Sequence, residues 1–139
     1  HMIIELGGIT MLSNALVTVM NEDTAPSVIG ITSGIMSWFS STSGVVMPTL
    51  IPTIPNIVAQ LDGNLNPLEL ATAITMISNT AGISPLSTGG ALALAAYTSA
   101  ADASQQEQQK LFLEMFGISA FGVVVLCICA YFGLYRWLL

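Results

Sequence analysis

Long apolar stretches alternate with short charged segments along this chain, and their lengths predict membrane-spanning helices. Residues 24–61, 70–101 and 115–135 contain no charged side chain, over 38, 32 and 21 positions. The hydrocarbon core of a bilayer is about 30 Å thick, which about 20 helical residues cross. Only the third stretch therefore matches one plain crossing, because the first two are too long for single straight helices.

The first stretch has a polar interruption at its middle, a run of Ser40, Ser41, Thr42, Ser43 and Gly44. Prolines follow at positions 48, 52 and 55. Hydroxyl side chains compete for backbone hydrogen bonds, and glycine disfavours a helix interior. We therefore expect a re-entrant helical hairpin over residues 25–60, with its tip at 40–44.

The second stretch is interrupted by Gly82, Pro85, Gly89 and Gly90. Proline lacks a backbone N–H and clashes with the preceding helical turn, and glycine has a low helix propensity. We therefore expect a broken transmembrane helix over residues 68–99, with the break at 80–90.

Two further segments complete the predicted fold. Residues 111–137 are expected to form a C-terminal transmembrane helix, with Tyr131, Tyr135 and Trp137 at one membrane surface. Residues 3–22 are expected to be the end of a transmembrane helix, and residues 1–2 (His-Met) are typical of the scar left by a removed tag. The predicted class is an all-α membrane protein.

Composition agrees with lipid as the main solvent and excludes several function classes. Of the 139 residues, 53% are hydrophobic and 7% are charged, against about 25% charged in soluble domains. The net charge of −6 excludes a basic surface for nucleic acid. The acids, Glu69 among them, lie at the edges of the predicted spans, where solvation is expected. Because the sequence has no native histidine, no acid inside a span and no glycine-rich phosphate loop, we expect neither an enzyme nor a bound cofactor.

The two breaks in apolar segments indicate transport. Unwound backbone is tolerated at membrane depth only where protein or water covers it. In secondary transporters, freed carbonyls and half-helix ends bind ions and anionic groups near the membrane midplane. Both breaks are rich in hydroxyls, whose neutral oxygens suit a sodium ion and, with helix N-termini, a carboxylate. The alternative is a membrane scaffold subunit that transports nothing, in which these hydroxyls only join helices.

The second break also resembles a known family. SPLSTGGALALA at 84–95 follows ISNTAG at 77–82. Together they resemble the ion transporter superfamily that includes divalent anion/sodium symporters, and within it the bacterial malonate/malate-type dicarboxylate carriers. The resemblance covers essentially the whole chain, as one half of a transporter built from two inverted repeats. It implies cation-coupled uptake or exchange of a dicarboxylate or similar organic anion.

The resemblance also implies roles for individual residues. Members carry Ser-Asn-Thr at the hairpin tip, where this chain has Ser41, Thr42 and Ser43, with Thr in place of Asn. The substrate-binding residues are then Ser41, Thr42, Ser43, Ser84 and Pro85. The coupling-cation residues are Ser37, Ser41, Thr42 and Ile83. The second candidates are Ser78, Asn79, Thr80, Ser87 and Thr88.

Partners and location follow from the same resemblance. We expect a dicarboxylate substrate, the lipid bilayer, the N-terminal part of the parent transporter and a homodimer of the full-length protein, in a bacterial inner (plasma) membrane. Sodium and the proton are the candidate coupling ions. The rival within the superfamily is a cation/proton antiporter or an arsenite-type permease, and the absence of acids within the spans argues against it.

Overall fold

The chain is helical throughout the part that the structure describes. The computed structural model describes residues 7–61 and 65–138, and these residues form only helices, turns and short connections. The predicted all-α class is therefore confirmed for them. The predicted tag scar at 1–2 and the first residues of the segment 3–22 lie outside the described residues.

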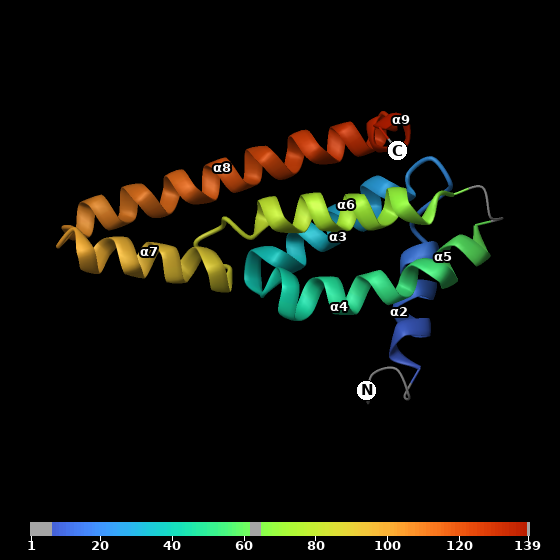
Figure 1. Ribbon diagram of the computed structural model, residues 1–139, viewed down its shortest axis with the longest axis horizontal. Coiled ribbons are helices and arrows are strands. Elements are labelled where there is room, and N and C mark those ends of the chain that lie inside the picture. The colour runs from blue at the N-terminus through green and yellow to red at the C-terminus, as the bar shows by residue number, and fades with distance from the viewer. Residues whose placement is uncertain (1–6, 62–64, 139) are drawn as a thin grey trace.

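A sharp turn joins two helical stretches in the region predicted to form a hairpin. After α2 (Gly8–Val17), helix α3 spans Ala25–Phe39. The chain then reverses direction and continues as one helical stretch over residues 42–60 (Figure 1). That stretch consists of the π-helix η1 (Thr42–Val46), α4 (Met47–Leu50), the 3-10 helix η2 (Ile51–Thr53) and α5 (Ile54–Gln60).

The three prolines lie inside this second stretch and do not end it. Pro48, Pro52 and Pro55 each occupy one of the first two positions of a short helical segment. At such positions a missing N–H costs little. Their spacing places them on one helix face, and all three are exposed. The chain therefore stays helical past each proline by changing helix type.

The second break separates two helices that continue in the same general direction. α6 (Pro67–Ala81) ends before Gly82, and α7 (Thr88–Ala100) resumes beyond the break. α8 (Gln105–Tyr131) then runs back alongside both helices, and α9 (Leu134–Leu138) ends the described chain (Figure 1).

Packing of α3, α6 and α8 forms the core. Ile29, Ile74 and Ile77 are fully buried there. Gly30 allows α3 to approach α6 closely, because a Cβ at this position would overlap Cδ1 of Ile77. This close approach brings the end of α3, and with it the hairpin turn, beside the end of α6.

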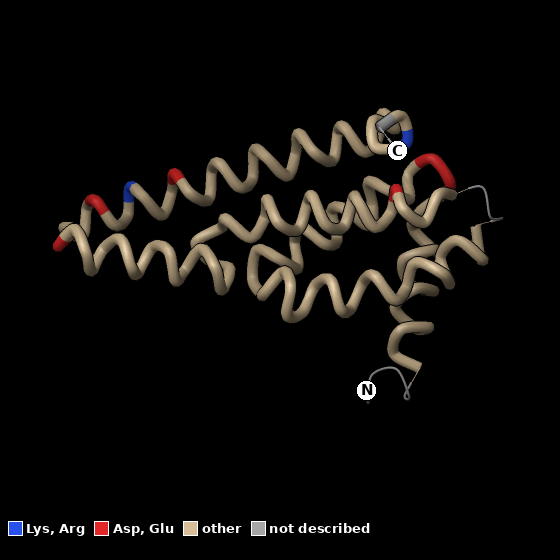
Figure 2. Tube along the Cα trace, viewed as in Figure 1, with Lys and Arg blue, Asp and Glu red and all other residues tan. Residues whose placement is uncertain are grey.

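Two helical stretches, residues 42–60 and 105–131, are long and apolar enough to cross a membrane by length and composition. α8 exposes large apolar side chains, with Phe121 72% exposed. Charged residues gather toward the two ends of the molecule (Figure 2).

One acid differs from the expectation that the acids are solvated. The side chain of Glu69 is only 4% exposed.

Candidate functional site

The hairpin turn and the second helix break, far apart in the sequence, meet at one cavity of about 260 Å³. Its lining residues come from the turn, the last turn of α6 and the break: Ser40, Ser41, Thr42, Ser43, Asn79, Gly82, Ile83, Ser87 and Gly89. The two interruptions that the sequence places in separate apolar segments therefore face each other. No charged side chain is among these residues.

Four helix ends converge on this cavity. α3 and α6 end beside it, and η1 and α7 begin there. The first N–H groups of a helix lack intrahelical acceptors and carry partial positive charge, whereas the last carbonyls carry partial negative charge. The cavity therefore offers N–H donors suited to an anion and carbonyl oxygens suited to a cation.

Serine side chains cap both helix starts. The hydroxyl of Ser41 accepts from the Gly44 N–H at 3.1 Å, and that of Ser87 accepts from the Gly90 N–H at 3.0 Å. Each serine thus lies three residues before the glycine it contacts, which is the usual N-cap spacing. Ser87 also donates to the Gly82 carbonyl at 2.6 Å, which ties the start of α7 to the end of α6.

Three oxygen atoms crowd together where the hairpin meets α6. The hydroxyls of Ser37 and Thr42 lie 2.7 and 3.0 Å from the Ser78 carbonyl oxygen, and 2.5 Å from each other. Three contacts share two hydroxyl protons, so at least one contact joins two oxygens without a proton between them. The side chains of Ser37 and Ser78 are fully buried. Neutral oxygens grouped in this way are of the kind that bind hard cations.

The space beside Gly82 is surrounded by oxygens. A Cβ at this position would lie 2.9 Å from the Thr42 hydroxyl oxygen, 3.2 Å from the Asn79 carbonyl oxygen and 3.4 Å from that of Ser78. Any side chain larger than hydrogen would therefore press against these oxygens. Two of the three also belong to the crowded group, so Gly82 allows the end of α6 to lie close to the hairpin.

Some predicted residues lie near the cavity without lining it. Ser84 and Pro85 are buried inside the break, and the Ser84 hydroxyl accepts from the Leu86 N–H at 3.2 Å. The Thr80 hydroxyl donates to the Met76 carbonyl within α6 at 3.0 Å. Thr88 is exposed at the first position of α7. At the break, the lining thus contains Ile83 and Ser87 and lacks Ser84 and Pro85.

Two residues near the cavity, Ser119 and Trp38, were not indicated by the sequence patterns. Ser119 is the one serine or threonine of α8 and is fully buried. Its hydroxyl accepts from the Trp38 indole N–H at 3.0 Å and lies 3.1 Å from the Ala81 carbonyl oxygen. A lone serine in an apolar span is a signal that could have identified it, since polar residues inside spans usually have partners.

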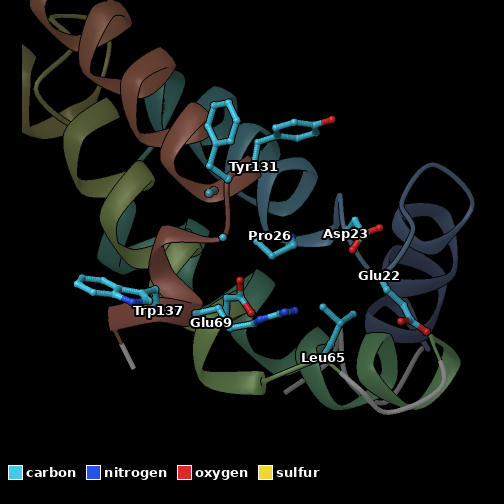
Figure 3. Close-up of a pocket in the computed structure, with 11 residues that line it drawn as sticks. Glu22, Asp23, Pro26, Leu65, Glu69, Tyr131 and Trp137 are labelled. Atoms are coloured by element: carbon cyan, nitrogen blue, oxygen red, sulfur yellow. The ribbon is translucent and has the colours of Figure 1, made fainter.

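A larger cavity, about 700 Å³, lies where α3 and α6 begin and α8 ends. Glu22 and Asp23 lie on one side of it, and Glu69 and Trp137 on the other (Figure 3). Its lining contains none of the residues predicted to bind substrate or cation. We assign the candidate site to the smaller cavity because the helix ends and hydroxyls converge there.

Comparisons of the chain with protein-family models, curated proteins and solved structures found no match.

Proposed function

We propose that this chain is the C-terminal part of a cation-coupled secondary transporter, in which the cavity between hairpin turn and helix break binds a dicarboxylate or a similar organic anion. The observation that carries the proposal is the convergence of four helix ends and several uncharged hydroxyls on that cavity. Secondary transporters bind substrates and ions at discontinuous helices of this kind.

The transporter proposal requires a membrane location. Exposed apolar side chains along α8 and the charges gathered toward the ends of the molecule (Figure 2) support lipid as the solvent around its middle. We propose a re-entrant hairpin at 25–60, a broken helix at 68–99 and a span at 111–137, within a multi-pass protein of a bacterial inner membrane. The resemblance to dicarboxylate carriers supports this location.

Two helix starts support an anionic substrate. η1 begins at Thr42 and α7 at Thr88, and residues next to both helix starts line the cavity. N–H groups at helix N-termini stabilise carboxylates, both by hydrogen bonds and through the helix dipole. A dicarboxylate would place one carboxylate at each helix start. The hydroxyls of Ser41 and Ser43 add donors beside the first.

The crowded oxygens support a monovalent cation as co-substrate. The Ser37 and Thr42 hydroxyls and the Ser78 carbonyl supply neutral oxygens, and Thr42 also lines the cavity. Neutral oxygens suit sodium, a hard cation. Its charge would offset that of the anion, so the loaded cavity crosses the bilayer at lower electrostatic cost.

In the proposed cycle, the anion and the cation bind together, and the hairpin and broken helix then move across the membrane with them. The N-terminal repeat of the parent transporter would supply a mirrored hairpin that completes the site. The resemblance supports this arrangement and a homodimer of the full-length protein.

The test is uptake of radiolabelled malonate, malate and succinate into proteoliposomes of the full-length parent, with and without a sodium gradient. We expect sodium-dependent uptake that falls at least about tenfold in Ser41→Ala, because one charge-assisted hydrogen bond to a carboxylate is worth about 1.5–3 kcal/mol. Ser37→Ala should raise the sodium concentration for half-maximal uptake. The matched control is Ser13→Ala, since Ser13 is also fully buried but bonds only within its own helix.

Other results would change or end the proposal. Uptake driven only by a proton gradient would keep the anion and replace sodium as the coupling ion. Sodium–proton exchange without dicarboxylate uptake would favour the antiporter. If no solute moves and neither substitution has an effect beyond that of Ser13→Ala, the scaffold alternative stands.

A further inference from the structure

We infer that Ser119 and Trp38 are positioning residues that fix the two walls of the proposed cavity relative to each other, an inference that rests on the proposed transport function. Neither side chain lines the cavity. Both act through the backbone segments that do.

Ser119 connects α8 to the end of α6. Its hydroxyl lies 3.1 Å from the Ala81 carbonyl oxygen and 3.3 Å from that of Thr80. Each of these carbonyls accepts from the backbone N–H three residues later, that of Ser84 or Ile83, and has a second lone pair for an outside donor. Gly82, which lines the cavity, follows Ala81 directly. Ser119 thereby holds the backbone at the start of the helix break.

Trp38 connects the same hydroxyl to the hairpin. Its indole N–H donates to the Ser119 oxygen at 3.0 Å, and its ring lies against that of Phe116 in α8, with centroids 5.7 Å apart. Trp38 is the penultimate residue of α3, two residues before Ser40 in the cavity lining. One serine therefore joins the turn on one wall to the break on the other.

The hydroxyl of Ser119 both donates and accepts in this bridge. A serine hydroxyl has one proton to donate and two lone pairs to accept with, and here it donates to α6 and accepts from α3. Alanine at this position would leave an indole N–H without its partner in an apolar interior and release the α6 end from α8. Threonine would keep the hydroxyl and add one methyl group.

A positioning role predicts a particular kinetic change. The N–H groups and oxygens of the site would all remain in Ser119→Ala, but their spacing would relax. If this relaxation weakens the contacts to the substrate by as much as the loss of one hydrogen bond, the affinity for the substrate falls about tenfold. The concentration for half-maximal uptake should therefore rise about tenfold, while the maximal rate per folded transporter stays within about twofold.

The first experiment measures dicarboxylate uptake by proteoliposomes of the full-length parent carrying Ser119→Ala, Ser119→Thr or Trp38→Phe. We expect the half-saturation concentration to rise in Ser119→Ala and Trp38→Phe and to return toward the original value in Ser119→Thr. Ser13→Ala is the control for loss of a buried hydroxyl. Equal half-saturation concentrations in all variants, or a loss of maximal rate alone, would overturn the inference.

The second experiment does not depend on transport. Ser43 is exposed and lines the cavity, so a cysteine there reports on access to it by its rate of maleimide labelling, with Cys127 and Cys129 replaced by alanine. We expect Ser119→Ala to change this rate at least about threefold and Ser13→Ala to leave it unchanged. If Ser119→Ala changes the labelling rate but the protein transports no dicarboxylate, the proposed function is wrong and the bridging role of Ser119 is supported. An unaltered rate would remove the bridge whatever the protein transports.

Discussion

Two adjacent glycines in the first turn of α7 allow a sharp test of the helix break. Gly89 and Gly90 occupy equivalent helical backbone, but their surroundings differ. A Cβ at Gly89 would meet only the Gly82 carbonyl oxygen, at 3.8 Å, which is ordinary contact. A Cβ at Gly90 would lie 2.6 Å from the carbonyl carbon of Ser84 and 2.8 Å from the Ile83 carbonyl oxygen, and closer still to the Ser84 oxygen. Gly90→Ala should therefore destabilise the protein, and Gly89→Ala should not.

The expected loss of stability is large because the atoms that the new methyl group of Gly90→Ala would meet belong to the backbone. A flexible side chain could rotate away, but the peptide between Ser84 and Pro85 must shift by close to an ångström. Overpacking that shifts side chains and backbone costs about 1–3 kcal/mol. The higher helix propensity of alanine offsets up to about 1 kcal/mol. We therefore expect Gly90→Ala to lower the free energy of unfolding by about 2 kcal/mol.

The assay is thermal unfolding of the purified protein in detergent, followed by near-UV circular dichroism. At roughly 3 °C per kcal/mol for a chain of this size, Gly90→Ala should lower the midpoint by about 6 °C. Gly89→Ala, which adds the same methyl group one residue earlier, should stay within about 2 °C. A Gly90→Ala midpoint equal to that of the original protein, or an equal loss in Gly89→Ala, would refute the packing described for the break.

Two further predictions test the neighbouring helices. A Cβ at Gly122 would lie 2.5 Å from the Thr80 methyl group, so Gly122→Ala should lower the free energy of unfolding by about 1–2 kcal/mol. Thr80→Ser removes that methyl group and should restore most of the lost stability. A double-mutant cycle of unfolding midpoints measures both effects. Glu107 lies outside the proposed span and accepts hydrogen bonds from the backbone N–H and the hydroxyl of Ser104, which lower its pKa. Its stabilising contribution is present above the ordinary pKa of 4.5 and is lost as the pH falls through the lowered value. Hydrogen exchange in the first turn of α8, corrected for its intrinsic pH dependence, should therefore speed up at acid pH, and in Glu107→Gln this change should disappear.

Residue chemistry accounts for where the chain turns and breaks. The turn after α3 lies at Ser40 and Ser41, and the gap between α6 and α7 contains Gly82 and Pro85. Hydroxyls, glycine and proline disfavour helix for reasons that act within one turn, so a sequence can reveal them. The second arm of the hairpin shows the limit of such reasoning. Its prolines are tolerated because each one starts a new helical segment, which depends on the helix types adopted on both sides.

The burial of a side chain at a helix end could also not be predicted from the residues of that helix alone. The sequence places Glu69 beside the charged edge of a span, where solvation is the ordinary expectation. The structure buries it between the start of α6 and the end of the chain, in the larger cavity that also contains Arg136. Only the packing of α9 against α6 brings these two residues to the same cavity. No spacing within one helix could have indicated it.

Buried serines of this chain differ in whether they donate within their own helix or to another one. Ser13 and Ser37 are both fully buried in helices, yet Ser13 donates within its own helix and Ser37 donates across to α6. Among the described residues, the hydroxyls of α3, η1 and α8 that bond the backbone of another helix at 3.1 Å or less all contact the last turn of α6. The Ala81 carbonyl has no N–H partner four residues later, because residue 85 is proline, whereas the Ser78 carbonyl also accepts from the Gly82 N–H at 2.9 Å. The last turn of α6 thus supplies the acceptors that hold α3, η1 and α8 beside the break.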